Sequence, residues 1–158
     1  MAAHRASATL VAPEHLLMDA MRSVTVAFRA WLSEILPRHG LGMAQFWTLT
    51  DISDHGPLNA AHLATYRCVT PPSVSVVVDE LVRAGWVDRQ RSEEDRRVVV
   101  LSVTPAGRKL VAELWHQLGE RTTEATRAIP RKEIEVTARV LSSFGSRTDG
   151  LVSNGGPA

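Results

Sequence analysis

The chain has 158 residues, of which 44% are hydrophobic and 22% are charged. This length suits a single domain and this composition is typical of globular proteins, so a wholly disordered or fibrous chain is excluded. Lys and Arg number 18 against 17 Asp and Glu, and the resulting net charge of +1 gives no overall attraction to nucleic acid.

The compartment is predicted from what the sequence does not contain. One cysteine cannot form an internal disulfide, which fits a reducing environment. No apolar run approaches the roughly 18 residues of a membrane span, and the first residues lack the apolar stretch of a signal peptide. We therefore expect a soluble protein of the cytoplasm with no membrane partner.

A long amphipathic helix is predicted over about 13–37. Pro13 suits a first helical turn, and Pro37 together with Gly40 provides a stop. Apolar residues recur along this helix in steps of four and three: Leu17, Met21, Val24, Phe28, Trp31 and Ile35. Its other side is also partly apolar, so we expect it to contact a second layer. A second helix is predicted over 43–53.

Two shorter helices follow, and each has a recognisable start. Asn59 is expected to cap the first of them, because its side chain can accept a bond from a free backbone N–H group. Thr70 is expected to cap the next, which begins at Pro71 and ends before Gly85. Val74, Val77, Val78 and Leu81 are expected to form its buried stripe, and Gly85 to have a left-handed backbone. The β-branched run inside that helix could also form a strand, but the cap, the proline, the 3–4 spacing and the glycine favour a helix.

The apolar period then falls to two, which predicts a β-hairpin with strands at 86–89 and 98–103 and a charged, exposed tip. Two more helices are predicted to begin at Thr104 and Pro130. We therefore expect a mainly α fold with a small β-wing, in which long helices flank a winged helix-turn-helix core. Such a core presents one helix to the major groove of DNA, while the hairpin reaches the flanking backbone or minor groove.

Five short motifs in this region occur in an order and spacing that resemble the MarR family of transcriptional regulators. They are Leu63-Ala64, Ser73 with Ser75, the segment from Leu81 to Gly85 followed by Arg89, Asp95-Arg96-Arg97, and Thr104 to Arg108. The resemblance covers about 58–110, and the flanking helices fit the family architecture more generally.

The resemblance implies a repressor that binds a palindromic operator in double-stranded DNA as a homodimer. It also implies release from DNA by a small anionic aromatic or phenolic effector. The resemblance implies a single domain over 13–147, flanked by tails at 1–12 and 148–158. Within that domain, a DNA-binding lobe is expected at about 55–104 and dimerisation helices at about 13–37 and 104–147.

Dimerisation would explain apolar stripes that lie outside the winged helix. The interface residues expected from these stripes are Leu17, Leu110, Leu114, Leu118, Ile134, Leu141 and Phe144. The alternative is that the stripes pack within one chain. Two-fold symmetric dimers are common, and the winged helix leaves these helices little core to cover, so we favour the dimer.

The residues expected to contact DNA are Asn59, Thr70, Pro72, Ser73, Ser75, Val76, Arg89, Arg91, Arg96 and Arg97. The helix expected to enter the groove contains no Arg, Lys, Asn or Gln between residues 70 and 79, so it lacks the usual bidentate contacts to guanine and adenine. Val76 is expected to meet a thymine methyl group instead. Attraction to DNA would come from the arginines of the hairpin, and Asp95 would stabilise the wing, either alone or through a salt bridge to Arg97.

An effector site is expected between the dimerisation helices and the winged helix. Its candidate residues are His15, Met18, Arg22, Trp47 and His62. An apolar crevice with one cation would suit an aromatic carboxylate. The alternatives are that Trp47 belongs to the core and that Arg22 lies on a solvated helix face.

No enzyme, metal or cofactor is expected. The sequence has no nucleophile motif and no glycine-rich phosphate loop, and its six histidines lack the spacing of metal ligands. Cys68 is expected to be an inert thiol, although a redox-sensing regulator acting through it stays an alternative. A winged helix that binds another protein is a further alternative, because the groove helix lacks basic side chains.

Overall fold

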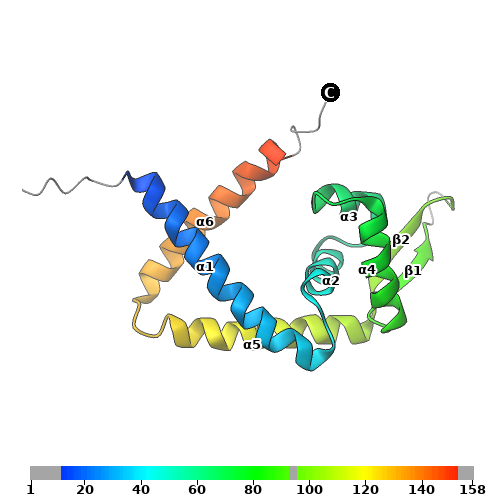
Figure 1. Cartoon of the computed structure of the whole chain (residues 1–158), viewed down its shortest axis with the longest axis horizontal. Coiled ribbons are helices and arrows are strands. Elements are labelled where there is room, and N and C mark those ends of the chain that lie inside the picture. The colour runs from blue at the N-terminus through cyan, green and yellow to red at the C-terminus, as the bar shows by residue number, and fades with distance from the viewer. Residues whose placement is uncertain (1–11, 93–95, 153–158) are drawn as a thin grey trace, which may run out of the picture. The chain divides into compact units, whose positions relative to one another are not determined.

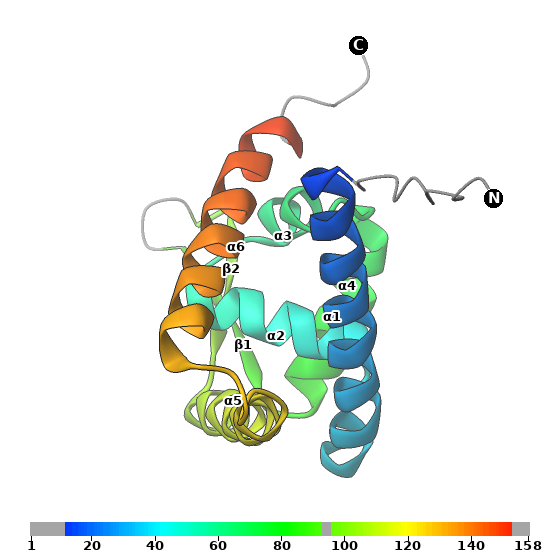
Figure 2. The same cartoon turned by 90° about the vertical axis from the view of Figure 1, so that its left-hand side faces the viewer.

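The computed structural model describes residues 12–92 and 96–152, with side chains to residue 144. Figure 1 shows the described elements in chain order, and Figure 2 shows them from the side. They are α1 (Pro13–Ile35), the short 3-10 helix η1 (Leu36–His39), α2 (Met43–His55), α3 (Ala60–Tyr66), α4 (Pro71–Arg83), β1 (Val87–Arg91), β2 (Val99–Val103), α5 (Pro105–Ala125) and α6 (Arg131–Val152). The expected fold class is confirmed: helices predominate and the two strands form a small antiparallel sheet. Over the described residues, no helix is long and apolar enough to cross a membrane.

The chain divides into two compact units, Met1–Leu118 and Gly119–Ala158, with the boundary inside α5. The first unit therefore contains α1 as well as the winged helix, because Leu32 and Ile35 at the end of α1 are buried in the same core as α2 and α4. The second contains the end of α5 and all of α6. The last helix continues to Val152, beyond the domain end expected at 147, because no proline interrupts it after Pro130.

The core of the first unit is built from every element up to Leu118. Its buried residues include Leu32, Ile35, Leu36, Phe46, Leu49, Ile52, Leu63, Val74, Val78, Leu81, Val87, Leu101, Val103 and Val111. Within this unit α4 lies between α3 and the hairpin, and α2 lies against both α4 and β2 (Figures 1 and 2). Helix α4 is the groove helix, the one expected to enter the major groove of DNA. It is therefore supported by three elements, α2, α3 and β1.

The structure corrects part of the expected dimer interface. Leu110, Leu114 and Leu118 are only 9%, 0% and 2% exposed within a single chain, so they cannot contact a partner. The first half of α5 supplies a wall of the core, which the alternative interpretation of these stripes predicted. The four other expected interface residues stay partly accessible: Leu17 and Ile134 are half-buried, and Leu141 and Phe144 are exposed.

The hairpin is shifted slightly from its expected bounds. β1 begins at Val87 and pairs with β2 in a register that places Arg89 opposite Leu101. On the side of β2 away from β1, Leu58 forms an isolated β-bridge with Leu101. The Leu58 N–H donates to the Leu101 carbonyl at 3.1 Å, and the Leu101 N–H donates to the Leu58 carbonyl at 2.7 Å. Leu101 is therefore held between two segments, while Val99 is exposed.

Candidate nucleic-acid interface

The two faces of α4 are sharply different. Val74, Val78 and Leu81 are buried in the core, as their spacing predicts. The opposite face is exposed and carries Pro72, Ser73, Ser75, Val76 and Asp79. Val76 is 60% exposed although its side chain is entirely apolar. This face is free to enter a groove and offers hydroxyl groups, methyl groups and one carboxylate.

The caps at the starts of α3 and α4 differ in their bonds. Asn59 caps α3 as expected, because its side chain accepts a bond from the backbone N of His62 at 2.8 Å. Thr70 occupies the cap position of α4, but its hydroxyl pairs with the Ser73 hydroxyl at 2.8 Å and makes no bond to the backbone. Pro72 has no N–H group, so of the two backbone donors that usually bind such a cap only that of Ser73 exists here. Asn59 is half-buried and serves the fold.

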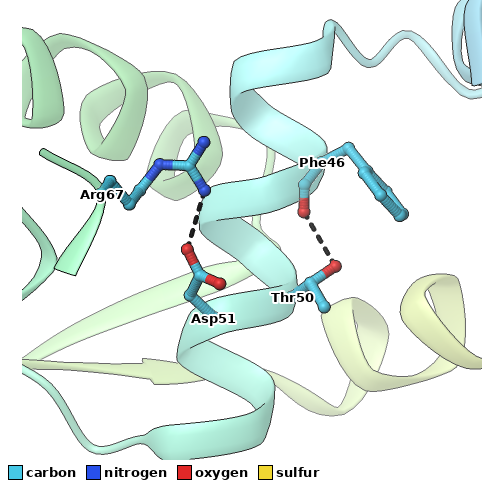
Figure 3. A network of polar contacts seen from close by, with 4 residues as sticks. All are labelled: Phe46, Thr50, Asp51 and Arg67. Carbon is cyan, nitrogen blue, oxygen red and sulfur yellow. Dashed lines mark hydrogen bonds and ion pairs between the residues drawn. The ribbon is translucent and has the colours of Figure 1, made fainter. Parts of the chain in front are cut away.

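A partly buried ion pair positions the turn between α3 and α4. Arg67 Nη1 lies 2.7 Å from Asp51 Oδ2, and the two side chains are 22% and 13% exposed. Figure 3 shows Arg67 reaching from the end of α3 to Asp51 on α2, one residue after Thr50, whose hydroxyl donates to the Phe46 carbonyl at 2.9 Å. Burial raises the pKa of Asp51, and the hydrogen bond and positive charge of Arg67 oppose that rise. The pair ties α2 to the turn that leads into α4.

A second polar link joins α2 directly to α4. Gln45 Nε2 donates to Glu80 Oε2 at 2.8 Å, while Oε1 of the same side-chain amide accepts a bond from the backbone N of Gly42. Sequence analysis missed both this link and the Asp51–Arg67 pair, because their partners lie 35 and 16 residues apart. No local pattern joins residues at such separations, so the signal exists only in the folded chain.

The hairpin carries most of the positive charge beside α4. Arg91, Arg96 and Arg97 are exposed, as expected. Asp95, expected to stabilise the wing, lies outside the described residues. Arg89 also lies on this hairpin, and its guanidinium forms an ion pair with Asp79 of α4. The middle of β1 is thus tied to the groove helix.

A cavity of about 300 Å³ lies between α3, α4 and the hairpin. Its lining residues are Ala60, Ser75, Val78, Arg89, Val99 and Leu101. Four of these six side chains are apolar, one carries a hydroxyl and one a positive charge. The cavity can therefore receive a small molecule with an apolar body and an anionic group.

None of the five residues expected to bind an effector lines this cavity. His15, Met18 and Arg22 are exposed on α1, where Arg22 pairs with Asp19 at 3.1 Å, and His62 is exposed on α3. Trp47 is half-buried against Phe28 and Phe46, with ring centroids 6.0 and 4.9 Å away. These contacts favour the alternatives, a core role for Trp47 and a solvated face for Arg22.

Cys68 is exposed in the turn after Arg67 and has a left-handed backbone with φ of 52°. Over residues 12–92 and 96–152, no group of three or more His, Cys, Asp and Glu side chains is arranged to hold a metal ion. The polar chemistry of this region therefore consists of ion pairs, hydroxyl groups and exposed arginines, which suits binding to an anionic partner.

Comparisons with known proteins agree with this geometry. The sequence model of the MarR family matches residues 41–99. The HTH-type transcriptional regulator YpoP of Bacillus subtilis is 32% identical over 104 residues, which cover 66% of this chain and 70% of that protein. The HTH-type transcriptional regulator FarR of Neisseria gonorrhoeae is 26% identical over 137 residues, 87% of this chain and 91% of its own.

Solved structures show the same fold. A MarR family protein from Bacillus stearothermophilus matches with a TM-score of 0.76 and 21% identity, over 85% of this chain and 94% of that one. The apo form of wild-type MarR from E. coli matches with a TM-score of 0.69 and 22% identity, over 81% and 95%. The matched region of the sequence contains α2, α3, α4 and the hairpin as far as Val99, which are the elements described above.

Proposed function

Because this chain belongs to the MarR family of DNA-binding transcriptional regulators, we propose that it is a repressor that binds a palindromic operator as a homodimer. The observation that carries the proposal is the pairing of an exposed groove helix with an arginine-bearing hairpin, both anchored to one core. A rigid helix can read base edges while the neighbouring arginines neutralise phosphates. Relatives of this chain are transcriptional regulators, a non-enzymatic role.

Exposed apolar side chains on α1 and α6 support the homodimer. They are Leu16, Met18, Val24 and Val26 on α1, and Val136, Val140, Leu141 and Phe144 on α6. Apolar residues grouped in this way favour contact with another surface, and a second copy of the chain is the most economical partner. A two-fold symmetric dimer would bind two half-sites about 10 bp apart, which is why the operator is proposed to be palindromic.

The proposed DNA contacts divide between the two elements. Thr70, Pro72, Ser73, Ser75 and Val76 of the α4 region would lie in the major groove. Arg89, Arg91, Arg96 and Arg97 of the hairpin would lie at phosphates or in the minor groove. With a net charge of +1, the chain attracts DNA only where its arginines are concentrated.

The cavity beside α4 supports a small aromatic carboxylate as the effector. Arg89 would bind the carboxylate and the Ser75 hydroxyl would add a hydrogen bond, while the aliphatic walls would cover the ring. Because both polar residues are also proposed to contact DNA, an effector in the cavity would compete with the operator. Benzoate is a suitable probe: it should release the duplex, and Arg89→Gln should remove that response.

Selection of bound duplexes from a random pool tests the proposal, followed by fluorescence anisotropy at several salt concentrations. We expect one palindromic sequence to be enriched and its affinity to fall steeply as salt rises. A winged helix that binds only another protein would enrich no sequence at any salt concentration. Oxidation of Cys68 that releases the selected duplex would instead support the redox-sensing alternative, and benzoate would then have no effect.

The dimer has its own test. Leu141→Glu combined with Phe144→Glu changes two exposed side chains of α6, so a folded protein should result that sediments as a monomer. Lys132→Glu with Arg139→Glu changes charge on the same helix without touching an apolar side chain and should leave the dimer intact. A folded Leu141→Glu/Phe144→Glu variant that still sediments as a dimer contradicts an interface at these residues.

A further inference from the structure

We propose that Asp79 is a specificity-determining residue that acts through Arg89, because it competes with DNA phosphates for the Arg89 guanidinium. This inference rests on the proposed function, since it assumes that α4 and the hairpin bind DNA. It concerns an acidic side chain on a surface that is otherwise suited to an anion. The order of residues alone does not indicate a partner for Asp79.

The geometry shows why the two groups meet. Asp79 is on the exposed face of α4, one helical turn after Ser75, and Arg89 is in the middle of β1. Arg89 Nη2 contacts Asp79 Oδ1 at 2.5 Å, and the pair connects the groove helix to the hairpin.

The pair is well placed to open when DNA arrives. The Arg89 and Asp79 side chains are 40% and 51% exposed, so water and salt screen their attraction. Such exposed pairs stabilise a fold by about 0–1 kcal/mol, far less than a buried pair. Asp51 and Arg67 are much less exposed and hold the turn before α4. The Asp79–Arg89 pair is therefore not required to hold α4 in place.

A phosphate and a carboxylate offer an arginine the same chemistry. Both present anionic oxygens that accept two parallel N–H bonds from one guanidinium. In a loosely docked complex with unrelated DNA, the Asp79–Arg89 ion pair stays intact, and Arg89 neutralises no phosphate. In a closely docked operator complex, a phosphate replaces Asp79 and the contact is gained. Asp79 thus lowers the affinity for unrelated DNA more than the affinity for the operator.

The test compares variants by fluorescence anisotropy on the selected operator and on an unrelated duplex of equal length, each over a range of salt concentrations. Asp79→Asn removes the charge that competes for Arg89. Asp88→Asn is the matched control: Asp88 is an exposed neighbour whose carboxylate accepts bonds from the backbone N of Arg89 and from Gln90 Nε2 rather than from the Arg89 guanidinium. Both variants change the net charge equally, so only the release of Arg89 differs.

We expect Asp79→Asn to bind the unrelated duplex about three- to tenfold more tightly at low salt, with a salt slope steeper by about one phosphate contact. Its affinity for the operator should rise less, so the specificity ratio falls. Asp88→Asn should change either affinity less than twofold. Adding Arg89→Gln to Asp79→Asn should abolish the gain, and Asp79→Ala should behave as Asp79→Asn does.

Other outcomes overturn the inference in distinguishable ways. If Asp79→Asn and Asp88→Asn have equal effects, general charge explains them and Asp79 does not act through Arg89. If the gain persists in the double variant with Arg89→Gln, another group makes the new contact. If operator affinity falls in Asp79→Asn, the carboxylate itself contacts a base. If the wild-type protein binds no duplex at any salt concentration, the proposed function fails together with this inference.

Discussion

The groove helix α4 and the hairpin beside it have opposite surface chemistry. The described exposed face of α4 before its last turn has hydroxyl groups, a valine and an acid, and it contains no basic side chain. The hairpin has four arginines in β1 and the described part of its tip. Helix α4 is supported by a partly buried ion pair and by the Gln45–Glu80 bond, while the hairpin is a sheet of only two strands.

This difference separates two tasks that many DNA-binding helices combine. A rigid, nearly uncharged helix can distinguish bases by fit and methyl contacts but contributes little affinity. Arginines on an extending hairpin supply affinity that is nearly independent of sequence. Changes to the supports should therefore affect folding, changes to the hairpin should affect binding to all duplexes, and changes to α4 should affect one base pair.

The largest effect is expected at the base of the hairpin, where Gly107 is buried at the start of α5. A Cβ atom there would lie 2.2 Å from the Trp86 carbonyl oxygen and 2.7 Å from Val103 Cγ1. The Trp86 backbone could move away only at a large cost in free energy. Gly107→Ala should therefore destabilise the fold by about 3 kcal/mol or more, which is the upper range for overpacking. Chemical denaturation measures this change.

Gly119→Ala is the matched control for Gly107→Ala, because it lies in the same helix and its Cβ would meet no atom within 4 Å. It should stabilise the protein by about 0.5–1 kcal/mol through helix propensity. Equal stabilities for the two variants would show that the hairpin base is not closely packed against α5.

The next largest effect concerns the support of α4. Arg67→Met leaves the Asp51 carboxylate largely buried without its cation and should destabilise the fold by about 2 kcal/mol at neutral pH. Burial already raises the folded-state pKa of Asp51, and loss of Arg67 raises it further. The folded variant thus binds the proton more tightly than the unfolded chain does.

The sign of the pH dependence follows from that raised pKa. The contribution of Asp51 to stability is fully present below its unfolded pKa and is lost as the pH rises through the folded pKa. In urea denaturation, Arg67→Met should therefore lower the free energy of unfolding less at pH 4 than at pH 7. Adding Asp51→Asn should remove this difference between the two pH values. A cost that is the same at both pH values would mean that the Asp51 carboxylate is well solvated.

A smaller effect is expected for DNA binding through the tip of the hairpin. Arg96→Ala with Arg97→Ala should weaken binding to every duplex by about tenfold at moderate salt and lower the salt slope by about one unit per lost phosphate contact. Anisotropy titrations measure both quantities. Arg29→Ala with Lys132→Ala removes the same charge from exposed positions of α1 and α6 and should leave the slope unchanged. Equal slopes for the two double variants would exclude the tip from the interface.

The smallest effect is expected for base readout by α4. If Val76 covers a thymine methyl, Val76→Ala should weaken operator binding by on the order of 1 kcal/mol, and replacing that thymine by uracil should cost about the same. The two changes should not add, because they remove the same contact. Uracil placed outside the half-sites provides the control. An operator whose affinity is unchanged by uracil throughout would show that Val76 has another role.

Local rules predicted the winged helix well because its signals are short in range. The spacing of Val74, Val78 and Leu81 predicted the buried face of α4, Asn59 predicted a cap that forms, and Gly85 has the left-handed backbone expected of it, with φ of 77°. Thr70 shows the limit of such rules. It occupies the cap position, but its hydroxyl pairs with the Ser73 hydroxyl and makes no bond to the backbone.

Sequence periodicity alone could not assign the partner of an apolar stripe. Leu110, Leu114 and Leu118 have the same spacing whether they face their own core or a second chain, and the structure places them in their own core. Trp47 and Arg22 likewise carry chemistry suited to a ligand site, yet one packs against aromatic rings and the other lies exposed on α1. The cavity described beside α4 is lined in part by Ala60, Ser75 and Val99, which come from three elements.

The sequence by itself determined the order and type of the elements, the face that α4 buries and the concentration of arginines in the hairpin. These depend on interactions between residues a few positions apart, and such interactions leave periodic or capping patterns in the chain. Only the tertiary structure decided which leucines of α5 are core, which acid holds Arg67, and that Asp79 meets Arg89. Each of these pairs residues from different elements, and the free energy of such a contact depends on burial and distance, which the order of residues does not specify.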